Sequence, residues 1–112
     1  MDDNNKYTNY NKNPSFSDLK QMFNKYNSNI IIYGHNHNRL ISFKDDKYFI
    51  NPGSLGCPSN DKDIARAIIL EINENISFKL IENHYNVYDV IESIKKLNYP
   101  SKDEILKIFY GV

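Results

Sequence analysis

Two histidines, separated by one residue, stand directly after an apolar run in this sequence. The run is Ile30 to Tyr33, and Gly34-His35-Asn36-His37 follows it. Neutral imidazole is a good ligand for zinc, manganese and iron, and residues at i and i+2 on a strand or its exit turn point to the same side. His35 and His37 can therefore face one cavity as part of a metal site. The alternative interpretation is a polar surface turn whose two histidines are incidental.

Several neighbours of the histidines suit such a site. Gly34 has no Cβ, so the backbone can leave the strand there and come close to a ligand. Asn36 and Asn38 can hydrogen-bond to the local backbone and hold the turn. The C-terminal end of a central strand in an α/β layer is also a common place for ligands. These features favour a metal over an incidental turn.

A second turn, Asn51-Pro52-Gly53-Ser54, follows its own strand in the same way. Pro52 fixes one backbone torsion and Gly53 permits another, so we expect a rigid corner. Its backbone amides and the Ser54 hydroxyl are able to face an anion, which makes Asn51, Gly53 and Ser54 candidates for shaping the site or contacting substrate. The alternative is a tight turn that touches no substrate.

Length and composition limit what such a site can do. With 112 residues the chain is at most one domain. Its 14 basic and 14 acidic residues balance, so no overall field attracts nucleic acid or an anionic membrane, and we expect neither as a partner. The single Cys57 excludes an internal disulfide and an all-thiolate zinc site, and its bland interpretation is a small half-buried residue. No segment reads as a membrane span or a signal peptide, so we expect a cytoplasmic protein.

The apolar pattern predicts the elements that position the two turns. Residues 1–13 are nearly all polar and are expected to form a flexible arm. From residue 14 apolar side chains recur at helical spacing as far as Tyr26, and Ser15 with Asp18 is placed as a capping box. Ile30 to Tyr33 is typical of a fully buried central strand.

The remainder of the chain predicts two hairpins followed by two helices. The hairpin strands are expected over residues 40–43 and 48–50, and over residues 67–72 and 76–81. A helix is expected over Val87 to Leu97, and a shorter one after Pro100 that is capped by Ser101 with Glu104. This order of elements predicts an α/β layered fold whose second half is largely antiparallel.

Taken together, the two turns resemble the calcineurin-like metallophosphoesterase family. A G-H-x-H motif after an apolar strand, then a short hairpin, then N-P-G-S is the pattern of the C-terminal half of that domain. The tail resembles small bacterial phosphodiesterases and diadenosine tetraphosphatase relatives at Tyr88-Asp89-Val90, Leu97, Pro100 and Gly111. The resemblance covers residues 14–112. It implies the C-terminal half of a four-layer αββα sandwich, with mostly antiparallel strands in its second half and C-terminal helices.

The resemblance also implies a chemistry. Members of the family hold two divalent metals, commonly Mn, Fe or Zn, and a metal-bound hydroxide attacks phosphorus in a small-molecule phosphoester. His35 matches the ligand of one metal and His37 the ligand of the other, and Gly34 matches the position of close backbone approach. Nothing else in the chain is given a ligand role.

The family's other ligand motifs are missing from this sequence. D-x-H, G-D-x-x-D and G-N-H-[DE] do not occur, and Asn83-His84, the nearest match, is interpreted as a solvent-facing or packed strand segment. We therefore expect a truncated gene product or one portion of a longer protein, inactive by itself as a phosphodiesterase or phosphomonoesterase.

Two further interpretations compete with an enzyme portion. The same fold also serves as a non-catalytic scaffold subunit of a protein coat, so an interaction module is the opposing function class. In the other, the half-domain completes itself by pairing, either with a second copy or with the missing N-terminal half, through the exposed edge of the Ile30 to Tyr33 strand.

Overall fold

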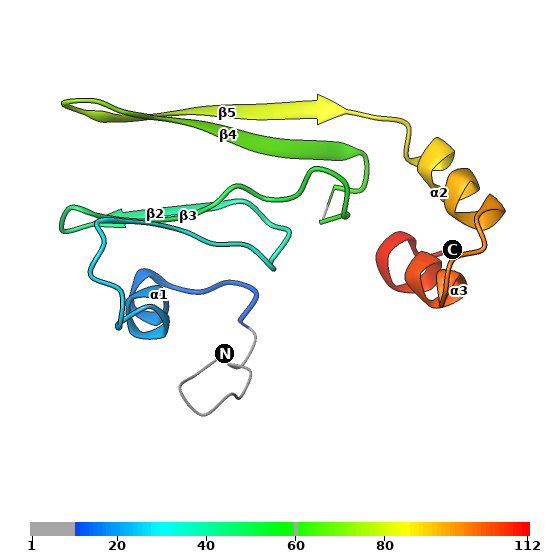
Figure 1. Cartoon of the computed structure of the whole chain (residues 1–112), viewed down its shortest axis with the longest axis horizontal. Helices are drawn as coiled ribbons and strands as arrows, with labels where there is room; N and C mark the ends of the chain where they lie inside the picture. The colour runs from blue at the N-terminus through cyan, green and yellow to red at the C-terminus, as the bar shows by residue number, and fades with distance from the viewer. Residues whose placement is uncertain (1–10, 60) are drawn as a thin grey trace.

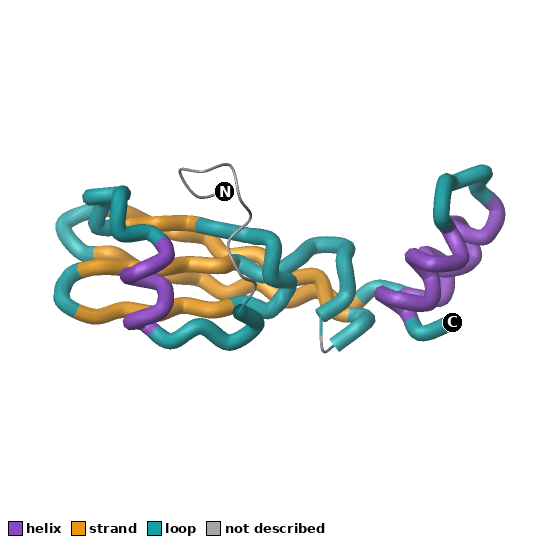
Figure 2. The backbone as a smooth tube through the Cα atoms, turned by 90° about the horizontal axis from the view of Figure 1, so that it is seen from below, coloured by secondary structure: helices purple, strands orange, loops and turns teal. Residues whose placement is uncertain are grey.

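The computed structural model describes residues 11–59 and 61–112, which form three stacked layers and a helical end (Figure 1). A helix, a mixed sheet and a two-stranded ribbon make the layers: α1 (Phe16–Met22); β1 (Ile30–Ile32), β2 (Leu40–Lys44) and β3 (Lys47–Asn51); β4 (Ile64–Ile72) and β5 (Ile76–His84). Beyond one end of the strands lie α2 (Val87–Lys96), α3 (Lys102–Ile105) and a π-helical turn, η1 (Leu106–Tyr110) (Figure 2). The predicted mixed α/β fold is confirmed.

The three-stranded sheet has the order β1-β3-β2, with β3 parallel to β1 and antiparallel to β2. The central position therefore belongs to β3, where Phe49 is 0% and Ile50 2% exposed. The prediction that Ile30 to Tyr33 forms a fully buried central strand is wrong for the described residues, since β1 lies at the edge and Ile32 is 61% exposed. An apolar run specifies a strand, but its place in the sheet depends on which neighbours pair with it.

The first helix begins as predicted and ends early. The Ser15 hydroxyl accepts from the Asp18 N–H (3.1 Å) and the Asp18 carboxylate accepts from the Ser15 N–H (2.8 Å), so the capping box is confirmed. The helix stops at Met22 and continues as a turn, short of the predicted end at Tyr26. The apolar side of this segment nevertheless faces the sheet: Phe16 in the helix packs edge-on against Phe49 at 5.3 Å, and Phe23, directly after the helix, stacks on Phe49 at 6.0 Å.

Both predicted hairpins are present, and the second is longer than its apolar pattern. Strands β4 and β5 pair from Ile64 opposite His84 to Ile72 opposite Ile76, beyond the predicted 67–72 and 76–81. The added residues include polar side chains, so backbone pairing continues where alternation no longer signals it. No helix among the described residues is long and apolar enough to span a membrane.

The C-terminal helices pack on each other around Ile91, Leu106 and Tyr110. Asn86 caps α2 by accepting from the Tyr88 N–H at 3.1 Å. The predicted cap at Ser101 is wrong, since Ser101 is left-handed (φ 54°) and its side chain makes no capping bond. A capping serine needs extended backbone, whereas this turn must reverse the chain so that Leu106 reaches Ile91.

Candidate functional site

The turn that contains His35 and His37, called the histidine turn below, follows the end of β1 at Ile32. The next N–H, that of Tyr33, still donates to Ile50 O (2.9 Å), and the chain then leaves the sheet. His35 is exposed and left-handed, with φ of 74°. The i and i+2 rule for strands therefore does not govern the two imidazoles, and the assignment of His35 as a ligand stays a prediction.

His37 is half-buried and has a defined hydrogen bond. Its Nδ1 lies 3.2 Å from Pro58 O. A carbonyl oxygen only accepts, so Nδ1 carries the proton and the lone pair of the neutral ring is on Nε2. The Phe109 ring packs 6.0 Å from the imidazole and limits its movement on one side. The ring is thus held in the protonation form that leaves one nitrogen able to bind a metal.

Asn51 joins the two turns. It is 0% exposed, its Nδ2 donates to Asn36 O (2.7 Å), and its Oδ1 accepts from the Gly53 N–H (3.0 Å). Asn36 in turn accepts from the Asn38 N–H at 3.3 Å, the kind of local bond predicted for it. The same side chain donates to Lys12 O at 2.6 Å. Residues 1–10 of the predicted arm lie outside the described residues.

The second turn is held by crowding and by local bonds. Gly53 has φ of 92°, and a Cβ there would lie 3.1 Å from the Arg66 Cβ and 3.4 Å from His37 O. The Ser54 hydroxyl accepts from the Cys57 N–H at 2.9 Å. Gly34 differs, because a Cβ there meets nothing within 4 Å and its φ is not positive. Among the described residues, neither crowding nor backbone torsion requires glycine at Gly34, and its place in a ligand site stays a prediction.

The thiol of Cys57 is not arranged as a nucleophile. Burial raises its pKa, which keeps it protonated at neutral pH. The half-buried position agrees with the structural interpretation of this residue.

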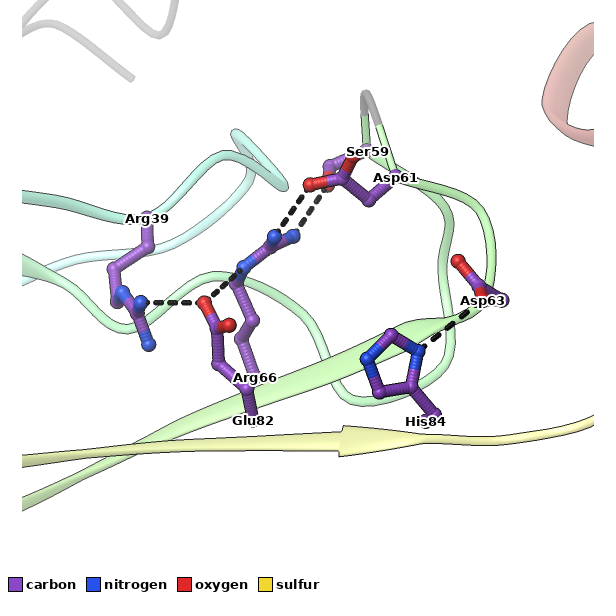
Figure 3. Close-up of polar contacts among 7 residues, drawn as sticks. All are labelled: Arg39, Ser59, Asp61, Asp63, Arg66, Glu82 and His84. Atoms are coloured by element: carbon purple, nitrogen blue, oxygen red, sulfur yellow. Dashed lines mark hydrogen bonds and ion pairs between the residues drawn. The ribbon is translucent and has the colours of Figure 1, made fainter.

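The described residues fit only part of a dinuclear metal centre. No group of three or more His, Cys, Asp or Glu side chains that could hold a metal occurs among them. His84, in the nearest match to a further ligand motif, is 73% exposed at the end of β5 and pairs with Asp63 at 3.2 Å (Figure 3). Of the two predicted positions, solvent-facing or packed, the structure shows the solvent-facing one. His35 and His37 are the candidates that remain.

An ion-pair network beside the turns was not predicted from the sequence. Glu82 accepts from Arg39 Nη2 at 2.6 Å and from Arg66 Nε at 3.0 Å, and Arg66 also donates to Ser59 Oγ (3.0 Å) and Asp61 Oδ2 (2.6 Å) (Figure 3). The bonds to Asp61 and Glu82 raise the pKa of Arg66, and the bond from Arg66 lowers the pKa of Glu82. One signal was available: Arg39 and Arg66 are the only arginines among 14 basic residues.

The network lines a polar hollow of about 340 Å³, whose wall consists of Asn13, Asn38, Arg39, Ser59, Asp61, Arg66 and Glu82. Asn38 follows His37 and Ser59 follows Pro58 in the sequence, so the hollow adjoins the histidine turn. Arg39 Nη1 is buried and has no hydrogen-bond partner among residues 11–59 and 61–112.

The family model for the calcineurin-like phosphoesterase superfamily domain matches residues 5–75. The chain belongs to this superfamily. The match includes both turns and the strand that carries Arg66, whereas Glu82 and the helices from α2 onward lie outside it. In this calcineurin-like phosphoesterase chain, the network therefore joins the matched segment to strand β5.

Solved structures similar to the chain include two of Vps29 from Entamoeba histolytica. The wild-type protein complexed with zinc is 27% identical (TM-score 0.47), and a single mutant is 28% identical (TM-score 0.47); each match covers 64% of this chain and 48% of the other. Vacuolar Protein Sorting 29 from Cryptosporidium parvum is 17% identical (TM-score 0.38, covering 63% and 45%). The chain thus spans about half the length of these structures. No curated protein matches it.

Proposed function

We propose that this chain is part of a metal-dependent phosphoesterase and supplies His35 and His37 to a dinuclear metal centre whose carboxylate ligands lie outside these 112 residues. The bond from His37 Nδ1 to Pro58 O is the observation that supports this proposal, because it places the lone pair of the neutral ring on Nε2. Metal-binding histidines are commonly held in this way, with the second nitrogen donating to a carbonyl or carboxylate. An incidental surface histidine has no need of a fixed tautomer.

Each residue of the two turns has a role in this proposal. His37, through Nε2, would hold one ion and His35 would hold the other. Asn51 keeps the turns at a constant separation, and Gly53 with Ser54 offers backbone N–H and hydroxyl groups to a phosphoryl oxygen. When bound, two divalent ions lower the pKa of a water nucleophile and neutralise charge on the phosphoryl group.

The described residues do not complete such a centre. A two-metal clamp needs carboxylates that bridge ions about 3.5–4 Å apart and balance their charge, and no three-ligand group occurs among the described residues. Two imidazoles alone bind one ion weakly. We therefore propose that these 112 residues alone turn over no phosphoester, and that turnover needs the complementing half, meaning the half of the domain that holds the carboxylate ligands.

Metal titration and turnover test this function together. Zinc or manganese is titrated calorimetrically into the wild-type chain and into His35→Ala, His37→Ala and the control His84→Ala. We expect weak binding that each turn variant abolishes and the control keeps. Hydrolysis of bis(4-nitrophenyl) phosphate should stay at background in every sample. Metal-dependent turnover by the isolated chain would refute its incompleteness, and zinc binding unaffected by either turn variant would refute the ligand assignment.

A non-catalytic interaction module is the second candidate. It is favoured by the same lack of a three-ligand group in the described chain and by large exposed apolar side chains such as Ile32, Leu55 and Ile108. Absence of any metal binding by the wild-type chain would favour this function over the first. The cytoplasm is the compartment we propose for either, since a half-buried free thiol suits reducing conditions.

A further inference from the structure

We infer that Arg66 is a positioning residue for His37: it holds the segment from Ser54 to Ser59 so that the Pro58 carbonyl fixes the His37 tautomer. This inference rests on the proposed role of His37 as a metal ligand. Nothing in the sequence motifs points to Arg66, which lies on β4, 29 positions after His37 in the numbering.

Arg66 forms hydrogen bonds to both ends of the segment from Ser54 to Ser59. Its backbone N–H donates to Ser54 O at 2.9 Å, and its Nη1 donates to Ser59 Oγ at 3.0 Å. Pro58, buried and directly before Ser59, presents the carbonyl that accepts from His37 Nδ1 at 3.2 Å. Both ends of the segment that carries this carbonyl are thus bonded to one residue.

Each nitrogen of the Arg66 guanidinium has a hydrogen-bond partner. Its side chain is only 14% exposed, and Glu82 and Asp61 hold Nε and Nη2 while Nη1 reaches Ser59 (Figure 3). The planar fork of arginine makes these bonds in fixed directions at once. Lysine keeps the charge but has a single nitrogen, so it cannot hold both carboxylates and Ser59 in the same geometry.

Arg39 serves as the control that distinguishes positioning of His37 from general stabilisation of the fold. It donates to the same Glu82 oxygen at 2.6 Å and is similarly covered, at 17% exposure. In the part of the chain that the structure describes, it donates to no atom of the segment from Ser54 to Ser59. If the ion pairs act only by stabilising the β4–β5 ribbon, replacing either arginine should have the same effect. An effect on His37 through the segment would follow from losing Arg66 alone.

Nitrogen-15 NMR of the histidine rings tests the inference on the full chain without metal. Two-bond proton–nitrogen spectra at about pH 8, where imidazole is neutral, report which nitrogen carries the proton. We expect wild-type His37 to be protonated at Nδ1, and Arg66→Met and Arg66→Lys to give a mixture of both tautomers. Arg39→Met should keep the wild-type spectrum. Ser59→Ala should shift towards the mixture, and Ser59→Thr, which retains the hydroxyl, should restore Nδ1–H.

Zinc affinity gives a second measurement. Loss of the group that orients a histidine ligand weakens metal binding by about 10- to 100-fold, and we expect this of Arg66→Met but not of Arg39→Met. An unchanged His37 tautomer in Arg66→Met, or an equal shift in Arg39→Met, would overturn the inference. If Arg66→Met fails to fold, the Ser59 pair decides the question. Tautomer control by Arg66 in a chain that binds no zinc would instead refute only the proposed function.

Discussion

At the scale of single residues, the two turns depend on side chains that do no chemistry. Asn51 is fully buried and uses both its amide groups, one on each turn. Arg66 acts on His37 through a carbonyl that belongs to another residue. In the proposed function the imidazoles supply the metal-binding atoms, whereas groups that are distant in sequence fix their geometry.

Asn51→Asp tests the link between the turns. The substitution keeps the volume of the side chain, but an aspartate oxygen cannot donate to Asn36 O, and it places an acceptor or a charge in a fully buried position. We expect a loss of about 1–3 kcal/mol in the free energy of unfolding, measured by urea denaturation. Asn83→Asp, on an exposed position of β5, serves as control and should change stability little. Equal effects at both positions would contradict a special role for Asn51.

The two glycines beside the histidines should respond oppositely to alanine. At Gly53 the left-handed torsion and the Arg66 Cβ at 3.1 Å both oppose a side chain, so Gly53→Ala should cost at least about 1–2 kcal/mol. At Gly34 a methyl group meets no atom within 4 Å, so Gly34→Ala should be neutral or stabilise by up to about 1 kcal/mol. Urea denaturation measures both. A fully stable Gly34→Ala that nevertheless binds zinc as well as wild type would remove Gly34 from the candidate site.

At the scale of elements, local sequence patterns predicted where α1 begins and where the hairpins turn better than where α1 ends or which strands lie side by side. The capping box of α1 depends on residues three apart and was predictable from Ser15 and Asp18 alone. The central position of β3 depends on pairing with β1 and β2, which no local pattern records. The ion-pair network around Glu82 could not be predicted from local patterns either, because Arg39 and Glu82 lie 43 positions apart. Ser101 had the right residue type for a cap, but tertiary packing of Leu106 required another backbone conformation.

The capping box makes the stability of α1 depend on pH. The backbone N–H of Ser15, and then its hydroxyl, lower the pKa of Asp18 below its ordinary value. A carboxyl whose pKa is depressed by folding stabilises the protein above the unfolded pKa of about 3.9 and loses that contribution as pH falls through the folded pKa. Wild-type stability should therefore fall towards Asp18→Asn below about pH 4. A constant difference between the two proteins from neutral to acid pH would show that the carboxylate contributes nothing.

Ser15→Ala removes the other half of the box. The Asp18 N–H then loses its acceptor at the first turn of a seven-residue helix. We expect a loss of about 1 kcal/mol, as for other capping serines. Ser17→Ala, two residues further on and exposed, is the matched control. Loss of helical signal by circular dichroism without any change in the control would support the assignment.

At the scale of the molecule, the chain is thin and incompletely covered. Its radius of gyration is 16.8 Å, against about 13 Å for a compact domain of similar length. Phe49 is buried against Phe16 and Phe23 on the α1 side of the sheet, and a separate group of buried residues, Ile91, Leu106 and Tyr110, lies between the C-terminal helices. No helix of the described residues lies over the outer face of the β4–β5 ribbon (Figure 1). Such a molecule offers edges and faces for a partner.

The edge of β1 is where we expect the isolated chain to pair with a second copy. Tyr33 N–H donates to Ile50 O and Asn29 O accepts from Tyr48 N–H, so odd-numbered residues of β1 face β3. The N–H and C=O groups of Ile30 and Ile32 therefore point to the other edge, where no described strand pairs with them. A two-fold axis would set β1 antiparallel to its own copy and cover Ile32, now 61% exposed.

Light scattering on the purified chain decides this prediction. Self-pairing predicts twice the chain mass of 13.2 kDa at high concentration, with dissociation on dilution. Ile32→Pro removes only an outward N–H and leaves the bonds to β3, so it should give the monomer mass with little loss of fold. Ile32→Val keeps that N–H and should remain dimeric. A wild-type mass of 13.2 kDa at every concentration would rule out self-pairing and leave the edge to the complementing half.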